Sequence, residues 1–284
     1  MNAAAVQIVD SHIHFWDPHT LHYPWLADLP PLRRAFLPAD YTAALADIPV
    51  THVVFVEGNC RPEETCREVE FVERLARSEP RVAGIVACAD VADSGRLGGT
   101  LEALARSPRL KGIRQNIQGQ PAGFALRRGF VDGVREVGRR KLVFDLCVTH
   151  DQLHEVVGLV RECPDTRFVL DHCGKPAIRH RQLDPWRGDI ALLAGCDNVC
   201  CKLSGLLTEA GADRWSADDL RPYAEWVVHC FGKERVMYGS DWPVLTLAGT
   251  YGDWYRFTQQ VTAGWSPGDA RRFYGDNAIR VYGL

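Results

Sequence analysis

The sequence predicts a single (β/α)8 barrel of the α/β class, and three observations support this prediction. Short apolar runs rich in β-branched residues occur eight times along the chain. Longer segments with helical periodicity separate these runs, and helical crossovers make consecutive strands parallel. The chain length of 284 residues also fits a fold that typically takes about 250 residues.

The eight predicted strands extend from near the N-terminus to residue 243. They cover residues 6–14 (VQIVDSHIH), 51–58 (THVVFVEG), 81–90 (RVAGIVACAD), 110–116 (LKGIRQN), 141–148 (KLVFDLCV), 167–174 (RFVLDHCG), 198–205 (NVCCKLSG) and 235–243 (RVMYGSDWP). The segment 62–78 begins with a proline and two acids, as helix N-termini prefer, and carries apolar residues at Val69, Val72 and Leu75. Segment 150–163 has the same helical spacing. An open doubly wound sheet is the alternative, but no GxGxxG or Walker loop follows the first strand.

The chain reads as one domain over residues 1–284, because no proline- or glycine-rich linker and no internal repeat divides it. Residues 15–38 form an unusually long and aromatic connection between the first strand and the first helix. Long loops in compact domains are commonly lids or binding loops. The aromatic residues Trp16, Tyr23 and Trp25 suit either core packing under this loop or contact with a sugar or planar ring.

Composition is that of a globular protein, with 46% hydrophobic and 24% charged residues. A formal charge of -3 gives no electrostatic reason to expect nucleic acid or a membrane surface as a partner. No apolar run approaches the roughly 18 residues of a membrane span, and the N-terminus lacks a signal-peptide pattern. We therefore expect a cytoplasmic protein that acts on a small molecule, with a homo-oligomer compatible with the sequence.

Polar residues stand at the ends of the predicted strands, where a purely structural strand would carry valine or isoleucine. They are His12 and His14 of the first strand, Glu57, Arg114, His172, Lys202 and Asp241. In a barrel the C-terminal strand ends meet at one rim, where active sites lie. By alternation Asp10, His12 and His14 share one face, so both imidazoles are expected to point inward.

Each of these residues also has a structural interpretation. Asp10 and Asp171 suit a role in orienting their neighbours, Glu57 suits a buried ion pair with Arg114, and Lys202 suits neutralisation of a carboxylate. His150 is expected to begin a helix. A single active site at the rim is nevertheless favoured, because the structural interpretations would otherwise have to converge on one rim by coincidence.

The motifs HIHFWDP with YPWL, LDHCGKP, KLSGL and GSDWPV together resemble the lactonase branch of the amidohydrolase superfamily. The resemblance runs from Asp10 to the C-terminal FYGDNAIRVYGL, and it includes sugar-lactone and pyrone-dicarboxylate lactonases. It implies a metal-ligand set of His12, His14, His172 and Asp241, with Lys202 and Arg114 as substrate-facing cations. The bridging lysine or glutamate and the extra histidine of two-metal relatives are not evident, so the resemblance favours one divalent ion, Zn²⁺, or a metal-free site, with no organic cofactor.

Lactone hydrolysis needs a base for water, a stabilised oxyanion and a proton for the leaving oxygen. We assign the base to Asp241, with His172 and Lys202 as its catalytic partners; in a metal-free site Arg114 would join them in polarising the carbonyl. Predicted substrate contacts come from Trp25, Arg114, Gln115, Glu57 and Trp242, and Asn116 is a further candidate for reading hydroxyls. Two alternatives remain open: a metal-dependent decarboxylase of an unsaturated acid, and a sugar-acid binding barrel without catalysis.

Overall fold

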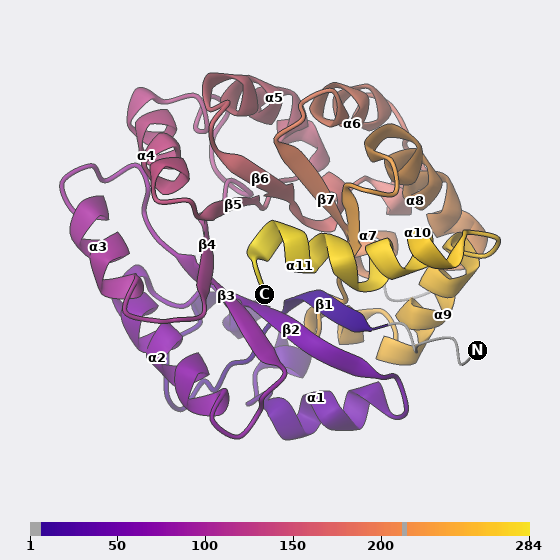
Figure 1. Ribbon diagram of the computed structural model, residues 1–284, viewed down its shortest axis with the longest axis horizontal. Helices are drawn as coiled ribbons and strands as arrows, with labels where there is room; N and C mark the ends of the chain where they lie inside the picture. The colour runs from indigo at the N-terminus through magenta and orange to yellow at the C-terminus, as the bar shows by residue number, and fades with distance from the viewer. Residues whose placement is uncertain (1–6, 212–214) are drawn as a thin grey trace.

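The computed structural model describes residues 7–211 and 215–284, and its strands form a ring enclosed by helices (Figure 1). All eight predicted strands are present. They follow one another around the ring in sequence order, and each neighbouring pair is parallel. The predicted (β/α)8 barrel is therefore confirmed.

The strands are β1 (Ile8–Ile13), β2 (Val50–Val56), β3 (Val82–Cys88), β4 (Leu110–Arg114), β5 (Val143–Leu146), β6 (Arg167–Leu170), β7 (Val199–Leu203) and β8 (Val236–Tyr238). The α-helices are α1 (Pro38–Leu45), α2 (Thr65–Leu75), α3 (Leu97–Leu104), α4 (Arg128–Arg139), α5 (Leu153–Glu162), α6 (Trp186–Ala194), α7 (Leu206–Ala210), α8 (Ala217–Phe231), α9 (Tyr251–Val261), α10 (Pro267–Arg271) and α11 (Asn277–Tyr282). In the part of the chain that the structure describes, no helix combines the length and apolar character that crossing a bilayer requires.

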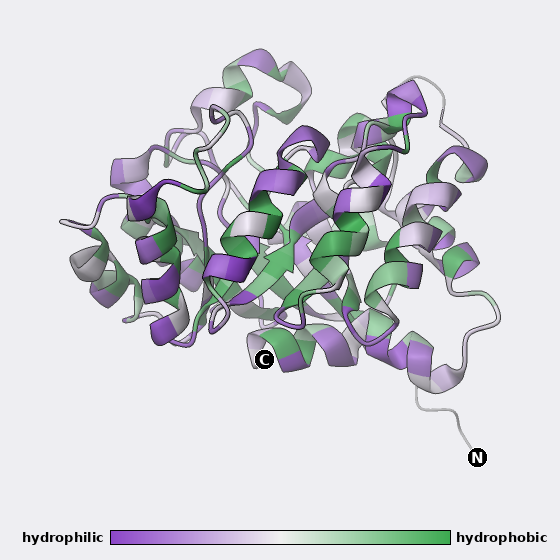
Figure 2. Ribbon diagram, turned by 90° about the horizontal axis from the view of Figure 1, so that it is seen from above, coloured by the Kyte–Doolittle hydropathy of each residue, from purple (hydrophilic) through white to green (hydrophobic). Residues whose placement is uncertain are grey.

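The helices predicted from periodicity lie where the sequence places them. A short 3-10 turn over Pro62–Glu64 precedes α2, and Val69 and Val72 of α2 face the core. Helix α5 likewise follows a 3-10 turn that begins at His150, as expected for that residue. Hydrophobic residues concentrate on the strands and on the inward faces of the helices (Figure 2), which is the amphipathic pattern of helices packed around a barrel.

The end of the barrel away from the strand C-termini is closed by α11, which lies across the ring of strands in Figure 1. Its Val281 and Tyr282 pack on an inward-facing layer made largely of valines from the strands. Closure of the ring takes place between the first and last segments. The amide of Asp241 donates to His12 O (2.9 Å) and the amide of His14 donates to Trp242 O (2.8 Å).

The long connection over 15–38 folds onto the strand C-termini. It contains 3-10 turns over Pro24–Asp28 and Pro30–Leu32. Trp16 and Phe36 exchange backbone hydrogen bonds of 3.1 and 2.9 Å, and the Trp16 indole donates to Arg34 O at 2.9 Å. Because Trp16 is fully buried, its ring anchors this connection to the barrel.

Candidate active site

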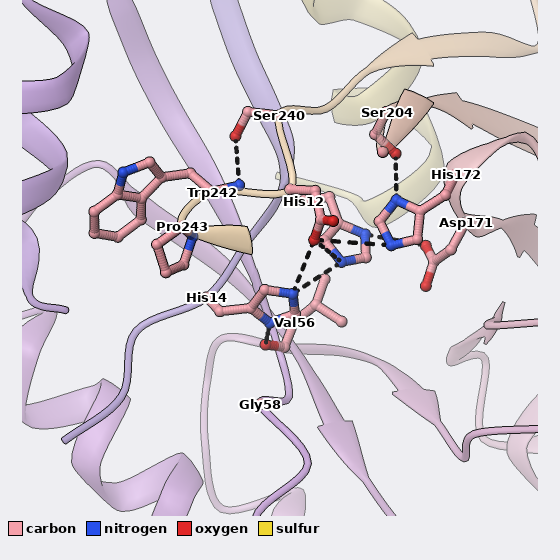
Figure 3. Close-up of polar contacts among 12 residues, drawn as sticks. His12, His14, Val56, Gly58, Asp171, His172, Ser204, Ser240, Trp242 and Pro243 are labelled. Carbon is pink, nitrogen blue, oxygen red and sulfur yellow. Dashed lines mark hydrogen bonds and ion pairs between the residues drawn. The ribbon is translucent and has the colours of Figure 1, made fainter. Parts of the chain in front are cut away.

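Four of the predicted site residues converge at the C-terminal end of the barrel (Figure 3). Oδ1 of Asp241 lies 3.2 Å from Nε2 of His14, 3.7 Å from Nε2 of His12 and 3.8 Å from Nε2 of His172. The Nε2 atoms of His12 and His14 are 3.2 Å apart. Side chains from the end of the first strand and from the segments just after the sixth and eighth strands therefore meet around one point.

The inward direction of the two β1 histidines depends on a local irregularity. The pairing of β1 with β2 shifts register between Asp10 and Ile13, and this bulge breaks the simple alternation of faces. Asp10 consequently points outward and accepts hydrogen bonds from Tyr41 (3.0 Å) and Tyr251 (2.9 Å) on the surrounding helices. The prediction that Asp10 shares the face of His12 and His14 is wrong. The other carboxylate oxygen of Asp10 accepts from the amide of Ser240 (2.8 Å). Asp10 therefore orients its neighbours.

Each of the three histidines is held through its other ring nitrogen. The Nδ1 atoms lie 2.8 Å from Val56 O for His14, 3.2 Å from Asp171 Oδ1 for His12 and 2.9 Å from Ser204 Oγ for His172. A carbonyl oxygen can only accept, so the proton of neutral His14 is on Nδ1 and its Nε2 presents a lone pair to Asp241. Such outer partners are what fix the orientation of metal-binding histidines.

Burial shapes the protonation states of this cluster. Burial lowers the pKa of His172 to about 4, and it lowers the pKa of His12 well below the ordinary value although Asp171 opposes this shift. Burial would raise the pKa of Asp241, but His172, His14 and His12 outweigh it and the pKa is lowered. The lowering at Asp241 depends on positive charge on these rings, whereas the lowered pKa values of His12 and His172 favour their neutral forms, so the cluster lacks the positive charge that the carboxylate needs.

The resulting arrangement suits a cation. With neutral rings, imidazole lone pairs and a carboxylate oxygen face one another, which is unfavourable unless a positive charge lies between them. The ligand atoms of His12, His14 and Asp241 all lie within 4.8 Å of one another. Ligands of a tetrahedral zinc ion, each about 2.0–2.2 Å from the metal, would be roughly 3.3 Å apart. His12, His14 and Asp241 thus fit Zn²⁺ in chemistry and in spacing, while His172, whose Nε2 lies 3.8 Å from Asp241 Oδ1, matches it in ligand type.

The sixth strand delivers His172 through a left-handed turn. Backbone φ is +52° at His172, +54° at Cys173, +69° at Gly174 and +47° at Lys175. A left-handed conformation costs about 1–2 kcal/mol for each residue that has a Cβ. The indole of Trp186 donates to Cys173 O at 2.8 Å and holds the turn. Consecutive strained residues of this kind concentrate at functional sites.

A layer of buried charges lies beneath the cluster. Nζ of Lys202 contacts Oδ2 of Asp145 at 2.6 Å and Oδ1 of Asp171 at 2.9 Å, and all three side chains are fully buried. Tyr282 of α11 also donates to Asp145 at 3.0 Å. Lys202 is thus a neutralising cation below His12, 3.3 Å from its Nδ1. The predicted substrate-facing role of Lys202 is incompatible with this position.

Arg114 and Glu57 form the buried ion pair that was one of their two interpretations. Nε of Arg114 donates to Glu57 Oε1 at 2.6 Å, Nη2 donates to Glu57 O at 2.7 Å and Nη1 donates to Asp171 Oδ2 at 3.2 Å. The Glu57 side chain is fully buried beneath the pocket, so it acts on a ligand through the cavity residues that it holds, Arg114 and Asn59, whose amide donates to Glu57 Oε2 at 2.7 Å. Arg114 itself lines the pocket described next.

Above the four converging residues the barrel opens into a cavity of about 560 Å³. Small-molecule sites commonly measure about 300–1,000 Å³. Its walls include His14, His172, Asp241, Arg114 and Trp25. Trp25 is only half-buried, and its indole donates to Gly58 O at 2.7 Å, so one ring of the aromatic connection over 15–38 faces the cavity.

Two predicted substrate contacts lie elsewhere. Trp242 is buried and packs against Phe15, Phe36 and Tyr41. Gln115 accepts from the amide of Val91 (2.8 Å) and donates to Asp90 (3.1 Å) on the side of β3. The substrate contacts predicted for Trp242 and Gln115 are therefore corrected: Trp242 supports the segment after β8, and Gln115 supports the segment after β3.

The cavity also contains side chains that the sequence reasoning did not select. They are Asn59, Arg61, Gln118, Cys147 and Lys175; Asn116 also lies in the wall, in agreement with the prediction. The signal for Lys175 was present in the sequence, because it belongs to the same LDHCGKP motif as His172. Loop residues such as Asn59 and Gln118 follow strand ends without any local pattern that marks them.

The profile of the amidohydrolase family matches residues 9–284. The chain belongs to the amidohydrolase family. This match covers nearly the whole chain and includes all four converging residues. The recognition of the amidohydrolase superfamily from the ordered motifs is thereby confirmed, and with it the expectation that the protein is a hydrolase.

Two relatives that are named as lactonases align with this chain over different lengths. An L-fucono-1,5-lactonase of Burkholderia ambifaria is 33% identical over 282 residues, which cover 96% of this chain and 94% of the relative. An L-rhamnono-gamma-lactonase of Scheffersomyces stipitis is 22% identical over 62% of this chain and 59% of the relative. A crystal structure of an amidohydrolase from Burkholderia multivorans with bound Zn has a TM-score of 0.86 and 30% identity, covering 98% of this chain and 99% of that one.

Decarboxylases are also among the similar structures. 2,6-Dihydroxybenzoate decarboxylase has a TM-score of 0.66 at 14% identity, covering 98% of this chain and 99% of that one. A likeness at this level of identity shows a shared fold and does not bear on the reaction.

Proposed function

We propose that this protein opens the lactone ring of a sugar acid by attack of an activated water, with Asp241 as the general base. The observation that carries the proposal is the convergence of an ionised carboxylate and three imidazole Nε2 atoms at the base of a cavity of about 560 Å³. The lactonases among the relatives support the ester substrate.

The proposed reaction begins with transfer of a proton from water to Asp241. The shortest contacts of Asp241 with the three histidines are all through Oδ1, so Oδ2 is available to take the proton. The water oxygen bonds to the carbonyl carbon, and the carbonyl oxygen takes the negative charge. The ring C–O bond then breaks, and Asp241 returns the proton to the departing alkoxide, giving a hydroxy acid.

One divalent metal, with Zn²⁺ as the best match, would be held by His12, His14, His172 and Asp241, and when bound it would lower the pKa of a water toward about 7. Asp171 and Ser204 orient the rings of His12 and His172 for that role. Lys202 keeps the Asp171 carboxylate charged: burial would raise the pKa of Asp171, but Lys202 and His12 outweigh this effect and lower it.

The cavity favours a hydroxylated ring as substrate. Trp25 offers an aromatic face to the C–H side of a sugar, while Arg114 and the amides of Asn59 and Asn116 supply polar groups. An ester is also the easier target for this catalytic set. A positioned base contributes about 10²–10⁴ in rate and one oxyanion donor about 10²–10³, which suits an activated ester better than an amide.

The test is a panel of five- and six-membered aldonolactones and aromatic-pathway lactones, with ring opening followed by a pH indicator. Asp241→Asn should fold normally by circular dichroism and lower kcat by about 10²–10⁴. Retention of full activity by this variant would exclude Asp241 as the base. Parallel assays after exhaustive chelation, with elemental analysis, test the metal: activity that survives without any bound metal would exclude the metal-dependent form.

The same panel distinguishes the alternative functions. Release of carbon dioxide from an unsaturated acid, with no lactone opened, would replace the proposal by a decarboxylase. Binding of sugar acids in calorimetry without any turnover would indicate a binding protein.

The matched control for Asp241→Asn is Asp90→Asn, because Asp90 is an exposed carboxylate beyond the end of β3 and its replacement should leave turnover unchanged.

A further inference from the structure

The left-handed turn after β6 brings a second side chain to the cavity besides His172. The turn ends at Lys175, whose amide donates to His172 O at 2.9 Å. Its carbonyl accepts from the ring of His150, with 3.2 Å between the atoms. A Cβ at Gly174 would lie only 2.6 Å from Leu153. The backbone at Lys175 is thus tightly constrained by its surroundings, and its side chain lines the cavity wall.

The ammonium of Lys175 has hydrogen bonds to spare. Among the described residues, Nζ donates one hydrogen bond, to Gln118 Oε1 at 2.6 Å, while an ammonium carries three N–H donors. Gln118 comes from the segment after β4, and its amide donates to Cys147 O at 3.0 Å beyond the end of β5, so this contact holds the lysine along the wall of the cavity. The other two donors are available to a ligand.

The charges around Lys175 keep it protonated next to the reacting groups. Burial would lower its pKa, but Cys147, Glu209 and Asp241 outweigh this effect and raise it. Lys175 and the proposed base Asp241 both line the same cavity. Lys175 is therefore a cation in the cavity with free donors, whereas Lys202 is fully buried and bonded to two carboxylates.

Arg114 is less suited to follow charge as it develops on a substrate. Three of its five N–H groups donate to Glu57 or Asp171, and these two carboxylates already balance its charge. An oxyanion donor needs a hydrogen atom directed at the reacting oxygen and a charge that is not neutralised by a nearby partner. Lys175 meets both conditions better than Arg114.

We propose that Lys175 is a catalytic residue whose ammonium donates a hydrogen bond to the lactone carbonyl oxygen and stabilises the oxyanion of the tetrahedral intermediate. This inference rests on the proposed lactone hydrolysis. The proton balance is unchanged, because Lys175 remains an ammonium throughout and Asp241 carries the transferred proton. When the ring C–O bond breaks, the carbonyl C=O bond reforms, and the negative charge moves to the leaving ring oxygen, which takes the proton from Asp241. Gln118 is the positioning residue that directs Lys175 along the wall of the cavity.

The experiment compares Lys175→Met and Lys175→Arg with the wild type on a lactone that the wild type opens. Lys175→Met should lower kcat by about 10²–10³, as loss of one oxyanion donor does, with little change in KM. Lys175→Arg should restore part of kcat because it keeps the charge and N–H donors. Lys111→Met is the matched control, since Lys111 donates to Gly283 O at the other end of the barrel (2.8 Å), and it should leave kcat unchanged.

A second measurement does not depend on turnover. The carboxylate of the ring-opened acid should place an oxygen where the oxyanion forms, so Lys175→Met should weaken binding of this product in calorimetry by about tenfold or more. A wild-type kcat in Lys175→Met, or equal product affinity in the two proteins, would overturn the inference. So would losses in Lys175→Met accompanied by a lower melting temperature and no rescue by Lys175→Arg, because these indicate a structural role. If the wild type itself opens no lactone, the proposed function fails first.

Discussion

Glu68 provides a direct test of the electrostatics beneath the aromatic connection. This residue of α2 is buried, and its Oε1 accepts from the amide of Gly58 at 3.0 Å. Burial raises its pKa to about 8 from the ordinary value of 4.5, and the nearby Glu57 carboxylate adds to the shift. Glu68 is therefore protonated in the folded protein at neutral pH. Glu68→Gln keeps the shape of the side chain and the oxygen that accepts from Gly58, but it has no carboxyl group that can titrate.

The magnitude follows from the two pKa values. Between pH 4.5 and about 8 the unfolded chain has lost this proton and the folded chain keeps it, so the stability that the proton provides is lost as pH rises through this window. Each pH unit within this window changes the free energy of unfolding by about 1.4 kcal/mol. Allowing for partial ionisation near the folded pKa, the wild type should lose about 2 kcal/mol relative to Glu68→Gln between pH 6 and pH 8.

The assay is urea unfolding of both proteins at several pH values, followed by tryptophan fluorescence. Titration of all other groups cancels in the difference between the two free energies of unfolding, so only Glu68 contributes to its slope. Glu70→Gln, exposed on the same helix, controls for a general effect of charge removal. A Glu68→Gln difference that stays constant with pH would refute the assignment of a protonated carboxyl at this position.

Two further predictions concern the cavity. Gly205→Ala should displace His172, because a Cβ at Gly205 would lie 2.7 Å from its ring and φ there is +68°; we expect loss of kcat together with a lower melting temperature, and wild-type values for both would contradict this packing. Trp25→Ala should raise KM with a small effect on stability, whereas Trp242→Ala should lower the free energy of unfolding by about 3–5 kcal/mol. Steady-state kinetics and urea unfolding distinguish these two outcomes, and the reverse pattern would contradict the placement of the two rings.

Much of the architecture follows from patterns that depend on nearby residues alone. Strands such as β2 and β5 are apolar runs flanked by helices with a hydrophobic stripe, and this order along the chain is enough to predict a parallel barrel. The convergence of His12, His14, His172 and Asp241 follows in turn, because the C-terminal strand ends of a barrel share one rim.

The direction of individual side chains depends on features that these patterns do not contain. The bulge in β1 turns Asp10 outward, and the left-handed turn after β6 brings to the cavity a lysine, Lys175, for which no role was predicted. Lys202 follows the alternation of β7 into the barrel interior, where Asp145 and Asp171 neutralise it, while Lys175 reaches the cavity from the loop. Trp242 is adjacent to Asp241 in sequence yet packs in the core, because the backbone after β8 sends successive side chains in different directions.

The bonds that join the segment after β8 to the end of β1 are also the bonds that bring Asp241 beside His12 and His14. Assembly of the proposed catalytic groups and closure of the ring of strands therefore depend on the same two hydrogen bonds, so we expect them to occur in one step of folding. Recovery of turnover after dilution from denaturant should consequently lag behind recovery of the helical circular dichroism signal. The rate at which turnover recovers would then report the rate at which the segment after β8 pairs with the end of β1.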